Sequence, residues 1–190
     1  MSRLAFLYGT VHANKTERAK FLKNRFLKYK FPVLLMAPVI THQDDISSYD
    51  YLIGKEENIF LTIKRQFPDL KLLIIDDAHL LSEVQIDQLL QVAITLNIAV
   101  LCFGLRTDFR TSGFPGARRL LELSQVVEKI PTFCSCGMEA IFSVRKVFGK
   151  TTFSGEKIAK EKDITYEALC PNCYYRKLIQ YKKLKESGRL

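Results

Sequence analysis

Four short apolar runs, spaced by stretches with a helical period, constrain the fold of this chain most strongly. The runs are LAFL at residues 4–7, FPVLLM at 31–36, LKLLII at 70–75 and IAVLCFGL at 98–105. Each is too short to cross a bilayer and suits a strand that is buried on both faces. Buried strands that alternate with helices predict an α/β domain built on a mostly parallel sheet with helices on both sides.

The segments between these runs predict where the helices lie. Residues 57–67 suit a helix that ends before Pro68, and residues 82–97 suit an amphipathic helix with Ser82 as its N-cap. The turn-rich stretch ITHQDDISSYDYLIGKEE predicts a loop with one short strand at residues 51–53. Pro38 is expected to stop the second strand.

The turn after the first run has the frame of a phosphate-binding loop. It reads GTVHANKT from Gly9 to Thr16, which matches G-x-x-x-x-G-K-[ST] except that Asn14 replaces the second glycine. Backbone N–H groups, the Lys15 ammonium and the positive end of the next helix would face phosphate oxygens, and Thr16 could bind Mg²⁺. Asn tolerates a left-handed backbone better than most residues, so the replacement is mild. An ordinary basic strand-to-helix connection is the alternative.

Two acids follow the run at residues 70–75. Asp76 and Asp77 come at the carboxyl end of a predicted parallel strand, where ligands of such sheets bind. One carboxylate could hold Mg²⁺ and its neighbour could accept a proton from an attacking hydroxyl. Two solvated acids at a strand end are the alternative. Together with the loop at Gly9, the acids favour nucleotide binding.

Five cysteines carry the most specific chemistry. Cys134 and Cys136 form a C-x-C pair, and Cys170 and Cys173 form a C-x-x-C pair. Two close pairs joined by a connecting segment predict a closed, structural four-thiolate zinc site in a reducing compartment, with Gly137 easing the first turn. The alternative is reduced cysteines without a metal. Cys102 lies in a strand and is expected to be core.

Charge is concentrated at the C-terminal end. Residues 141–190 hold 12 Lys and Arg against 5 Asp and Glu, whereas the first 140 residues hold 17 against 15. Such a basic region could attract nucleic acid or a phosphorylated small molecule, or be a solvated face. The last ten residues are expected to be a frayed, soluble end. The N-terminus shows no small-residue cleavage site, so we expect no signal peptide.

Over nearly its full length the chain resembles the zinc-containing, cytosolic (type II) thymidine kinases, as a divergent member. The resemblance rests on the phosphate loop, the strand ending in Asp76, the segment GLRTDFRTSGFPG at 104–116, the two cysteine pairs, and Tyr166 four residues before the second pair. It implies a P-loop (RecA-like) nucleotide-binding domain at residues 1–132. A small zinc-ribbon or lasso domain is implied at residues 133–190.

The resemblance also implies roles for individual residues. ATP and Mg²⁺ are expected to bind Gly9, Thr10, Val11, His12, Ala13, Asn14, Lys15, Thr16, Asp76, Asp77, Ala78 and His79. Asp77 takes the place of the family's catalytic glutamate, the base for the nucleoside 5′-hydroxyl. Thymidine is expected to contact Leu105, Phe109, Phe114, Ser143 and Tyr166, although core packing is the alternative for the two phenylalanines. A structural Zn²⁺ on Cys134, Cys136, Cys170 and Cys173, a homotetramer and a cytoplasmic location are implied as well.

Several positions depart from the family pattern. The Asp77 side chain is one methylene shorter than glutamate, which sets its carboxylate back by about 1–1.5 Å, enough to cost about a hundredfold in rate. His79 replaces a glutamine and Leu80 an aromatic residue. The family's D-x-R is not visible in residues 41–50, and the paired glycines before the lasso tyrosine are absent from residues 160–165.

Three functions are therefore compatible with the sequence. The first is an active thymidine or deoxyuridine kinase that uses ATP and Mg²⁺. The second is a non-catalytic relative that binds a nucleotide or a partner protein. The third is a nucleic-acid-binding protein that uses the basic zinc module. Such binding needs aromatic side chains on which bases stack, and Tyr174 and Tyr175 are the candidates.

Overall fold

The computed structural model describes residues 3–39, 46–156 and 163–188, and these residues form two compact units. The sheet unit comprises the described residues up to Tyr8 together with Asn14–Arg106 and Phe114–Lys129. The cysteine unit comprises Gly9–Ala13, Thr107–Gly113 and the described residues from Ile130 onward. The phosphate loop is therefore divided: its first five residues belong to the cysteine unit, and Asn14, Lys15 and Thr16 belong to the sheet unit.

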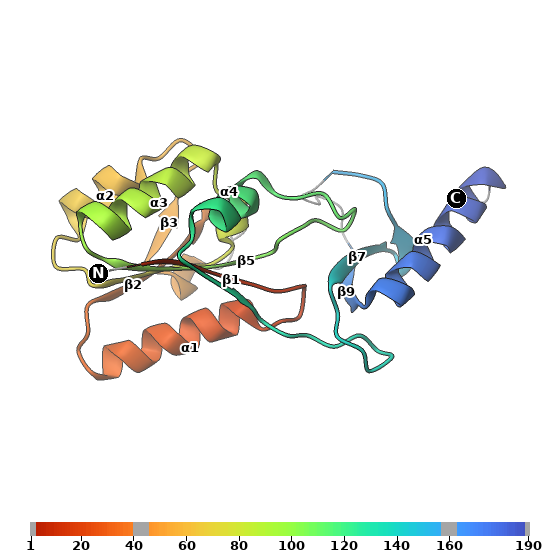
Figure 1. Ribbon diagram of the computed structural model, residues 1–190, viewed down its shortest axis with the longest axis horizontal. Helices are drawn as coiled ribbons and strands as arrows, with labels where there is room; N and C mark the ends of the chain where they lie inside the picture. The colour runs from red at the N-terminus through yellow and green to blue at the C-terminus, as the bar shows by residue number, and fades with distance from the viewer. Residues whose placement is uncertain (1–2, 40–45, 157–162, 189–190) are drawn as a thin grey trace. The chain divides into compact units, whose positions relative to one another are not determined.

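A six-stranded sheet with only parallel pairings forms the centre of the sheet unit (Figure 1). Its strands are β1 (Leu4–Tyr8), β2 (Val33–Pro38), β3 (Tyr51–Ile53), β4 (Leu72–Ile75), β5 (Ala99–Gly104) and β6 (Val126–Lys129). The strand order is β3-β2-β4-β5-β1-β6, so only β5 separates the strand before the phosphate loop from the strand before the acids. The predicted α/β class is confirmed.

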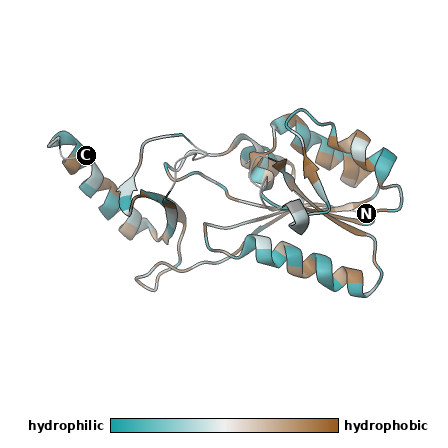
Figure 2. Cartoon of the chain, turned by 180° about the vertical axis from the view of Figure 1, so that it is seen from behind, coloured by the Kyte–Doolittle hydropathy of each residue, from teal (hydrophilic) through white to brown (hydrophobic). Residues whose placement is uncertain are grey.

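Helices cover both faces of this sheet (Figure 1). They are α1 (Lys15–Lys28) on one face, and α2 (Ile59–Gln66), α3 (Glu83–Thr95) and α4 (Pro115–Leu123) on the other. The inner strands β1, β2, β4 and β5 are mostly hydrophobic, whereas the helices carry both hydrophobic and hydrophilic residues (Figure 2). One apolar cluster fills the space between the strands and α2, α3 and α4.

The helix predictions hold, with boundaries that shift by one or two residues. Ser82 caps α3 in a capping box, in which its hydroxyl accepts from Gln85 N and the Gln85 side chain accepts from Ser82 N. Helix α2 begins two residues later than predicted because Glu57 has other partners. Its carboxylate accepts from Tyr51 Oη at 2.7 Å and from Gly54 N at 2.9 Å, so Asn58 serves as the N-cap.

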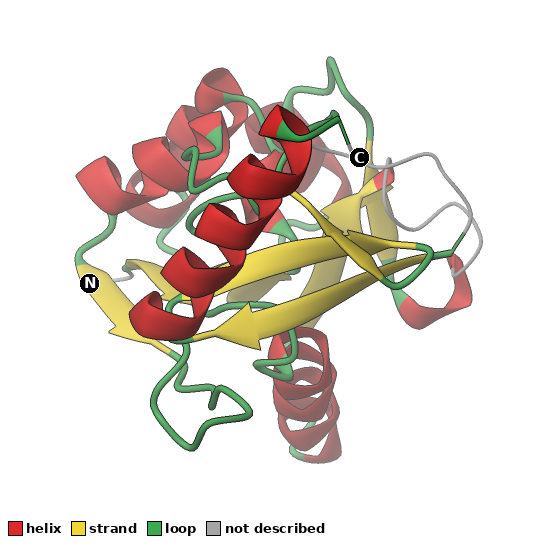
Figure 3. Ribbon diagram, turned by 90° about the vertical axis from the view of Figure 1, so that its right-hand side faces the viewer, coloured by secondary structure: helices red, strands yellow, loops and turns green. Residues whose placement is uncertain are grey.

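The cysteine unit has a small antiparallel sheet in the order β8-β7-β9. Its elements are β7 (Phe142–Val147), β8 (Lys150–Thr152), β9 (Ile164–Leu169) and α5 (Pro171–Glu186). Helix α5 packs against all three strands (Figure 3). The prediction of a frayed end is wrong for residues 181–186, which continue α5 with Lys183 and Lys185 in its last turn, where cations favour the helix dipole.

Some predictions concern segments that the structure covers only in part. Residues 41–45 of the segment examined for the D-x-R motif, and residues 160–162 of the segment before Tyr166, lie outside the described residues. The functional boundary between residues 132 and 133 stays a prediction. Within the described parts of the chain, no helix is long and apolar enough to cross a membrane.

Candidate phosphoryl-transfer site and cysteine centre

The phosphate loop begins at a position that accepts only glycine. A Cβ at Gly9 would lie 2.7 Å from the Cβ of Ala13 and 3.0 Å from the carbonyl oxygen of Ile130, distances that side chains do not tolerate. The turn closes where Ala13 N donates to the Thr10 carbonyl at 3.4 Å. The buried Thr10 hydroxyl donates to the Val11 carbonyl at 3.2 Å.

The second half of the loop leads into α1 through a left-handed residue. Asn14 has φ 50° and ψ 35°, and its carbonyl accepts from Arg18 N at 2.9 Å. This is the backbone shape that Asn tolerates and that glycine would adopt more easily. Lys15 and Thr16 follow as the first two helical residues, at the end of α1 where the helix dipole is positive. The sequence-based reason for accepting Asn14 is confirmed.

Asp76 is a buried carboxylate held by several donors. Tyr49 Oη donates to its Oδ2 at 2.9 Å, Asp77 N donates to its Oδ1 at 3.0 Å, and the Thr16 side chain also hydrogen-bonds it. Burial raises the pKa of Asp76, the nearby Asp77 charge raises it further, and the hydrogen bonds from Thr16 and Tyr49 oppose the rise. Thr16 and Asp76 thus place two hard oxygen groups together, the donor chemistry that Mg²⁺ prefers.

Lys15 belongs to the same cluster. Its side chain is nearly buried, and burial lowers the pKa of its ammonium, while the charges of Asp77 and Asp76 oppose that shift. An ammonium held close to two carboxylates in a partly desolvated place interacts strongly with added phosphate charge. The cluster therefore places an ammonium beside two carboxylates, Asp76 and Asp77.

Asp77 differs from Asp76 in exposure and backbone. It has φ 48° and ψ 32°, a left-handed conformation that is rare outside glycine, asparagine and aspartate. A quarter of its side chain is exposed, whereas Asp76 is fully buried. Within this pair, Asp77 is the acid that a substrate hydroxyl could reach, and Asp76 is the one held by protein donors.

His79 lies close to Asp77. Its Nδ1 is 3.9 Å from Asp77 Oδ1, and no described residue hydrogen-bonds that nitrogen. Burial lowers the pKa of His79 to about 4, the charge of Asp77 opposes this shift, and the charge of Lys15 adds to it. His79 is therefore neutral at pH 7. Its ring meets the Phe114 ring edge-on at 4.5 Å between centroids.

The remaining sheet-unit residues of the predicted site, Ala78, Leu105 and Phe114, belong to the apolar core or pack against it. Ala78 is fully buried in the single turn Ala78–Leu80, and a Cβ at Gly116 would lie 2.5 Å from the Leu81 carbonyl oxygen, so α4 approaches this turn closely. Leu105 packs against the core that contains Phe114. Leu105 and Phe114 thus belong to the sheet unit, whereas Phe109, Ser143 and Tyr166 belong to the cysteine unit.

In the cysteine unit, the first half of the phosphate loop touches predicted nucleoside residues. Val11 N donates to Ser143 Oγ at 3.3 Å, and His12 Nε2 lies 2.8 Å from the Tyr166 carbonyl oxygen, to which it donates. The His12 side chain, assigned to ATP from the sequence, is thus occupied by the backbone of β9. Two segments predicted to bind different substrates are in direct contact.

Phe109 is buried and held from several sides. Tyr174 Oη donates to its carbonyl oxygen at 3.2 Å, and the Arg145 guanidinium lies 3.9 Å above its ring. Its neighbour Asp108 accepts from the backbone N–H groups of Arg110 and Ser112, which stabilises the tight loop. Phe109 and Tyr166, both predicted to contact thymidine, lie near the same Arg145 guanidinium, whose carbon is 3.9 Å and 5.6 Å from their ring centroids.

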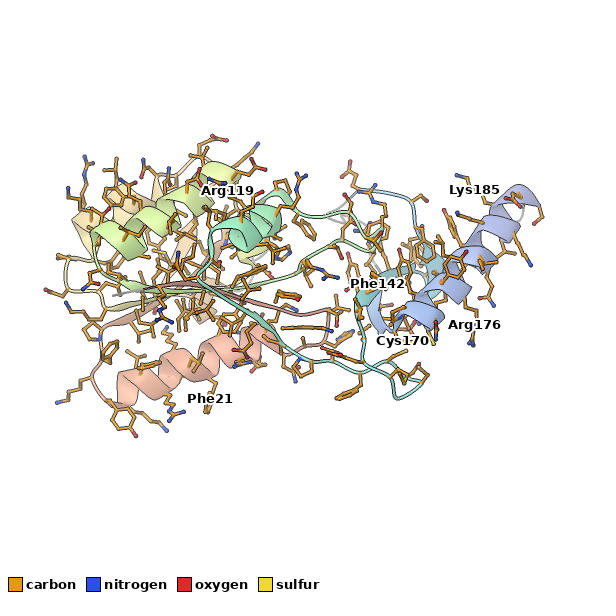
Figure 4. The ribbon with its side chains drawn as sticks, viewed as in Figure 1. Phe21, Arg119, Phe142, Cys170, Arg176 and Lys185 are labelled. Carbon is orange, nitrogen blue, oxygen red and sulfur yellow. The ribbon has the colours of Figure 1, made fainter. Side chains whose placement is uncertain are left out.

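The four predicted zinc ligands come together. The Sγ atoms of Cys134, Cys136, Cys170 and Cys173 all lie within 4.8 Å of one another, and those of Cys136 and Cys170 are 3.6 Å apart. A tetrahedral zinc with Zn–S bonds of about 2.3 Å needs sulfurs about 3.8 Å apart. Backbone N–H groups of Cys136 and Cys170 lower the pKa of Cys134 to about 6, which favours the thiolate that binds metal. Figure 4 shows Cys170 at the start of α5.

The first turn of this cluster is tight because Gly137 permits it. Gly137 has φ 86°, its N donates to the Cys134 carbonyl at 2.9 Å, and Cys134 N donates to the Met138 carbonyl at 2.8 Å. Only glycine adopts this backbone readily, as the sequence predicted. The fifth cysteine, Cys102, is buried in β5, and burial raises the pKa of its thiol, so it is an inert core residue.

Comparison with known protein families decides what this arrangement belongs to. The family described as thymidine kinase matches residues 2–174. The chain belongs to the thymidine kinase family. A thymidine kinase of Mannheimia succiniciproducens is 32% identical over 182 residues, covering 90% of this chain and 93% of that one. A thymidine kinase of Pasteurella multocida is 30% identical over 190 residues, covering 94% and 99%.

Solved structures give a looser likeness. AMPPCP-bound DnaA from Aquifex aeolicus is similar with a TM-score of 0.44 and 16% sequence identity, over 68% of this chain and 40% of that one. Pif1 helicase from Candida albicans is similar with a TM-score of 0.42 and 18% identity, over 67% and 36%.

Two residues that contact predicted site residues of this thymidine kinase family member are not among the sequence-based predictions. Tyr49 holds Asp76, but it lies in a turn-rich segment with no period, so nothing in the sequence links it to β4. Arg145 had a usable signal, because it lies two residues after Ser143 on one strand and so shares its face. A charged residue on the same strand face as a predicted site residue deserved a functional interpretation.

Proposed function

We propose that this protein transfers the γ-phosphoryl group of ATP to the 5′-hydroxyl of thymidine or deoxyuridine, giving dTMP or dUMP in nucleotide salvage. The observation that carries the proposal is the grouping of Lys15, Thr16, Asp76 and Asp77 in a chain of the thymidine kinase family. These side chains supply the cation, the metal ligands and the base that phosphoryl transfer needs.

Phosphate binding is assigned to the loop and the start of α1. Backbone N–H groups from Gly9 to Asn14 and the positive end of α1 attract the phosphates. Lys15 compensates the charge that develops on the terminal phosphates during transfer. Thr16 and Asp76 would hold Mg²⁺, and Tyr49 keeps the Asp76 carboxylate in position by donating to its Oδ2. The metal, when bound, neutralises charge on the phosphate oxygens.

Asp77 is assigned as the base that accepts the proton of the 5′-hydroxyl. As the 5′-oxygen bonds to the γ-phosphorus and the bond to the β-phosphate oxygen breaks, the hydroxyl proton passes to a carboxylate oxygen of Asp77 and ADP leaves. The partial exposure of Asp77 lets a substrate reach it, and the neutral His79 behind it adds no positive charge that would weaken the base. The left-handed backbone at Asp77 sets the direction of its short side chain.

The nucleoside is assigned to five residues that contact the base or its sugar: Leu105, Phe109, Phe114, Ser143 and Tyr166. A flat pyrimidine gains burial and stacking against aromatic rings, and a hydroxyl offers it a polar contact. A structural zinc on the four cysteines holds the cysteine unit together. A homotetramer and a cytoplasmic location complete the proposal.

The test is turnover with purified, zinc-loaded protein. ATP and Mg²⁺ are combined with thymidine, deoxyuridine, deoxycytidine and deoxyguanosine, and ADP and the nucleoside monophosphate are both quantified. We expect monophosphate from the first two nucleosides and none above background from the others. Calorimetric binding of thymidine and of a non-hydrolysable ATP analogue accompanies the assay. Binding of both without turnover would show a lapsed, non-catalytic relative, and turnover with none of the nucleosides and no binding would contradict the proposal.

A further inference from the structure

Arg145 is a buried cation in the small cysteine unit. It lies on β7, is 1% exposed, and is the largest of the fully buried side chains. Burying a guanidinium is costly unless its surroundings compensate the lost hydration. A small unit that keeps such a group in its interior must satisfy it with specific partners, so the partners indicate what the residue does.

Among the described residues, its partners come from three different segments. Arg145 Nε donates to Tyr166 Oη at 3.1 Å, across the β7–β9 register in which the two residues face each other. Arg145 Nη1 donates to the Glu156 carbonyl oxygen at 2.7 Å. The guanidinium carbon lies 3.9 Å from the centroid of the Phe109 ring and 5.6 Å from that of the Tyr166 ring.

These contacts use features that only arginine offers. A planar guanidinium can stack on an aromatic face while its in-plane N–H groups donate to oxygens at fixed angles. A lysine ammonium at the same place would keep the charge but could not stack and donate in two directions. The cation–π contact at 3.9 Å is in a desolvated place, where such contacts are strongest.

We propose that Arg145 is the positioning residue for the nucleoside base. It fixes the plane of the Phe109 ring through stacking and the phenol of Tyr166 through a hydrogen bond, so the two aromatic groups assigned to the base are held in one relative orientation. This inference rests on the proposed function and deepens its nucleoside site. Because Arg145 acts through other side chains, its loss should raise the KM for nucleoside without a matching loss at the ATP side.

The chain offers a matched control. Arg110 also lies over the Phe109 ring, at 5.4 Å, but its side chain is more than a third exposed and is paired with Asp108 at 3.1 Å. Arg145→Lys and Arg110→Lys therefore make the same chemical change at two guanidinium groups that lie over one ring. We expect Arg145→Lys to raise the KM and the Kd for thymidine about tenfold, and Arg110→Lys to leave both within about twofold.

The experiment measures thymidine binding by calorimetry, and kcat and both KM values by turnover, with zinc content and melting temperature as folding controls. In Arg145→Lys the KM for ATP should stay within about twofold. Tyr166→Phe, which removes only the hydroxyl that accepts from Arg145, should raise the KM for thymidine in the parent and add almost nothing in the Arg145→Lys background. If Arg145→Lys does not fold, an unchanged thymidine KM in Tyr166→Phe still overturns the inference.

Each possible result either overturns or supports the positioning role of Arg145. An unchanged thymidine Kd in folded Arg145→Lys, equal losses for thymidine and ATP, or an unchanged thymidine KM in Tyr166→Phe overturns the inference while leaving the proposed kinase function intact. A parent protein that binds and phosphorylates no nucleoside overturns the proposed function and, with it, this inference. A selective rise in the thymidine Kd and KM, coupled to Tyr166, supports it.

Discussion

The two units of this protein differ in the kind of side chain that they group together: charged side chains in the sheet unit and aromatic side chains in the cysteine unit. The sheet unit carries charged groups, Lys15, Asp76 and Asp77, at the ends of elements that rest on a large apolar cluster. The cysteine unit carries aromatic groups, Phe109 and Tyr166, around a buried guanidinium, on a smaller cluster that includes two of the four clustered cysteines. If the proposed function holds, phosphate chemistry would depend on local electrostatics in the sheet unit, whereas the contacts of Phe109 and Tyr166 with the nucleoside would depend on the integrity of the small cysteine unit.

Metal removal should have the largest effect and should separate the two units. Cys170→Ser removes one thiolate, and because structural zinc contributes about 10–16 kcal/mol of apparent binding free energy in small zinc-folded peptides, we expect loss of zinc and of the ordered cysteine unit. The sheet unit should stay folded on its own core. Metal analysis and hydrogen exchange of β7 and β9 against β1 and β4 make the measurement.

Cys102→Ala is the matched control, since Cys102 is the cysteine outside the cluster. It should keep about one zinc per chain and ordered β7 and β9, at the cost of some stability in the sheet unit. Zinc-free protein in which β7 and β9 remain as protected as in the parent would show that the cluster is not a folding centre.

The next largest effect should come from the base. Asp77→Asn keeps the size of the side chain but removes its basicity, so kcat should fall about 10²–10⁴-fold while the Kd values of thymidine and ATP stay nearly unchanged. Asp77→Glu extends the carboxylate and should keep or raise kcat. Steady-state turnover and calorimetry of both variants provide the values. Equal turnover of Asp77→Asn and the parent would remove Asp77 from the mechanism.

The sequence predicted the elements whose signals are local. The alternation of β1, β2, β4 and β5 with helices, the left-handed Asn14, the Ser82 cap and the four-cysteine cluster all depend on a short window or on residue chemistry. These features are the ones that the structure confirms.

What the sequence missed depends on distant partners. Glu57 leaves the predicted helix because Tyr51 and Gly54 bind its carboxylate, and Tyr49 joins the site through a hydrogen bond to a strand 27 residues away. Helix α5 extends to Glu186 although its last residues are polar, because its other face packs on the small sheet. Tertiary contacts override local preference in each case.

A smaller effect should appear as a pH dependence confined to the sheet unit. The folded pKa of His79 is about 4, below its ordinary 6.5, so between these values the unfolded chain binds a proton that the folded one does not. Stability should therefore fall as the pH falls from about 6.5 to about 4, by about 3 kcal/mol in total.

His79→Gln isolates this contribution. Denaturant unfolding of the sheet unit, measured for parent and variant near pH 7 and near pH 4, should show a difference that shrinks at low pH because only the parent loses the His79 contribution. Comparing the two proteins cancels the contribution of Asp76 to the pH dependence of stability. That contribution has the opposite sign, because the pKa of Asp76 is raised in the folded protein. The same acid sensitivity in both proteins would show that His79 is not the group responsible.

The smallest effect should come from His12, where the phosphate loop contacts a segment that is assigned to the nucleoside. His12 belongs to the phosphate loop by sequence, yet its Nε2 donates to the Tyr166 carbonyl oxygen at 2.8 Å, next to the Val11–Ser143 hydrogen bond. His12→Phe keeps a ring and removes the donor. Since a neutral, partly exposed hydrogen bond contributes about 1 kcal/mol, the Kd for thymidine should rise about fivefold.

Lys15→Met is the contrasting variant, because it removes the loop's ammonium without touching β9. It should weaken binding of an ATP analogue by more than tenfold and leave the thymidine Kd nearly unchanged, since an interaction between charged groups is lost only at the phosphates. Calorimetry of both ligands on both variants compares the two halves of one loop. If His12→Phe changes only ATP binding, as Lys15→Met should, the loop acts as a single phosphate-binding element and its first half does not support the nucleoside. If His12→Phe changes thymidine binding, the nucleoside depends on a residue that the sequence motif assigns to phosphate, because the loop's first five residues fold with the cysteine unit.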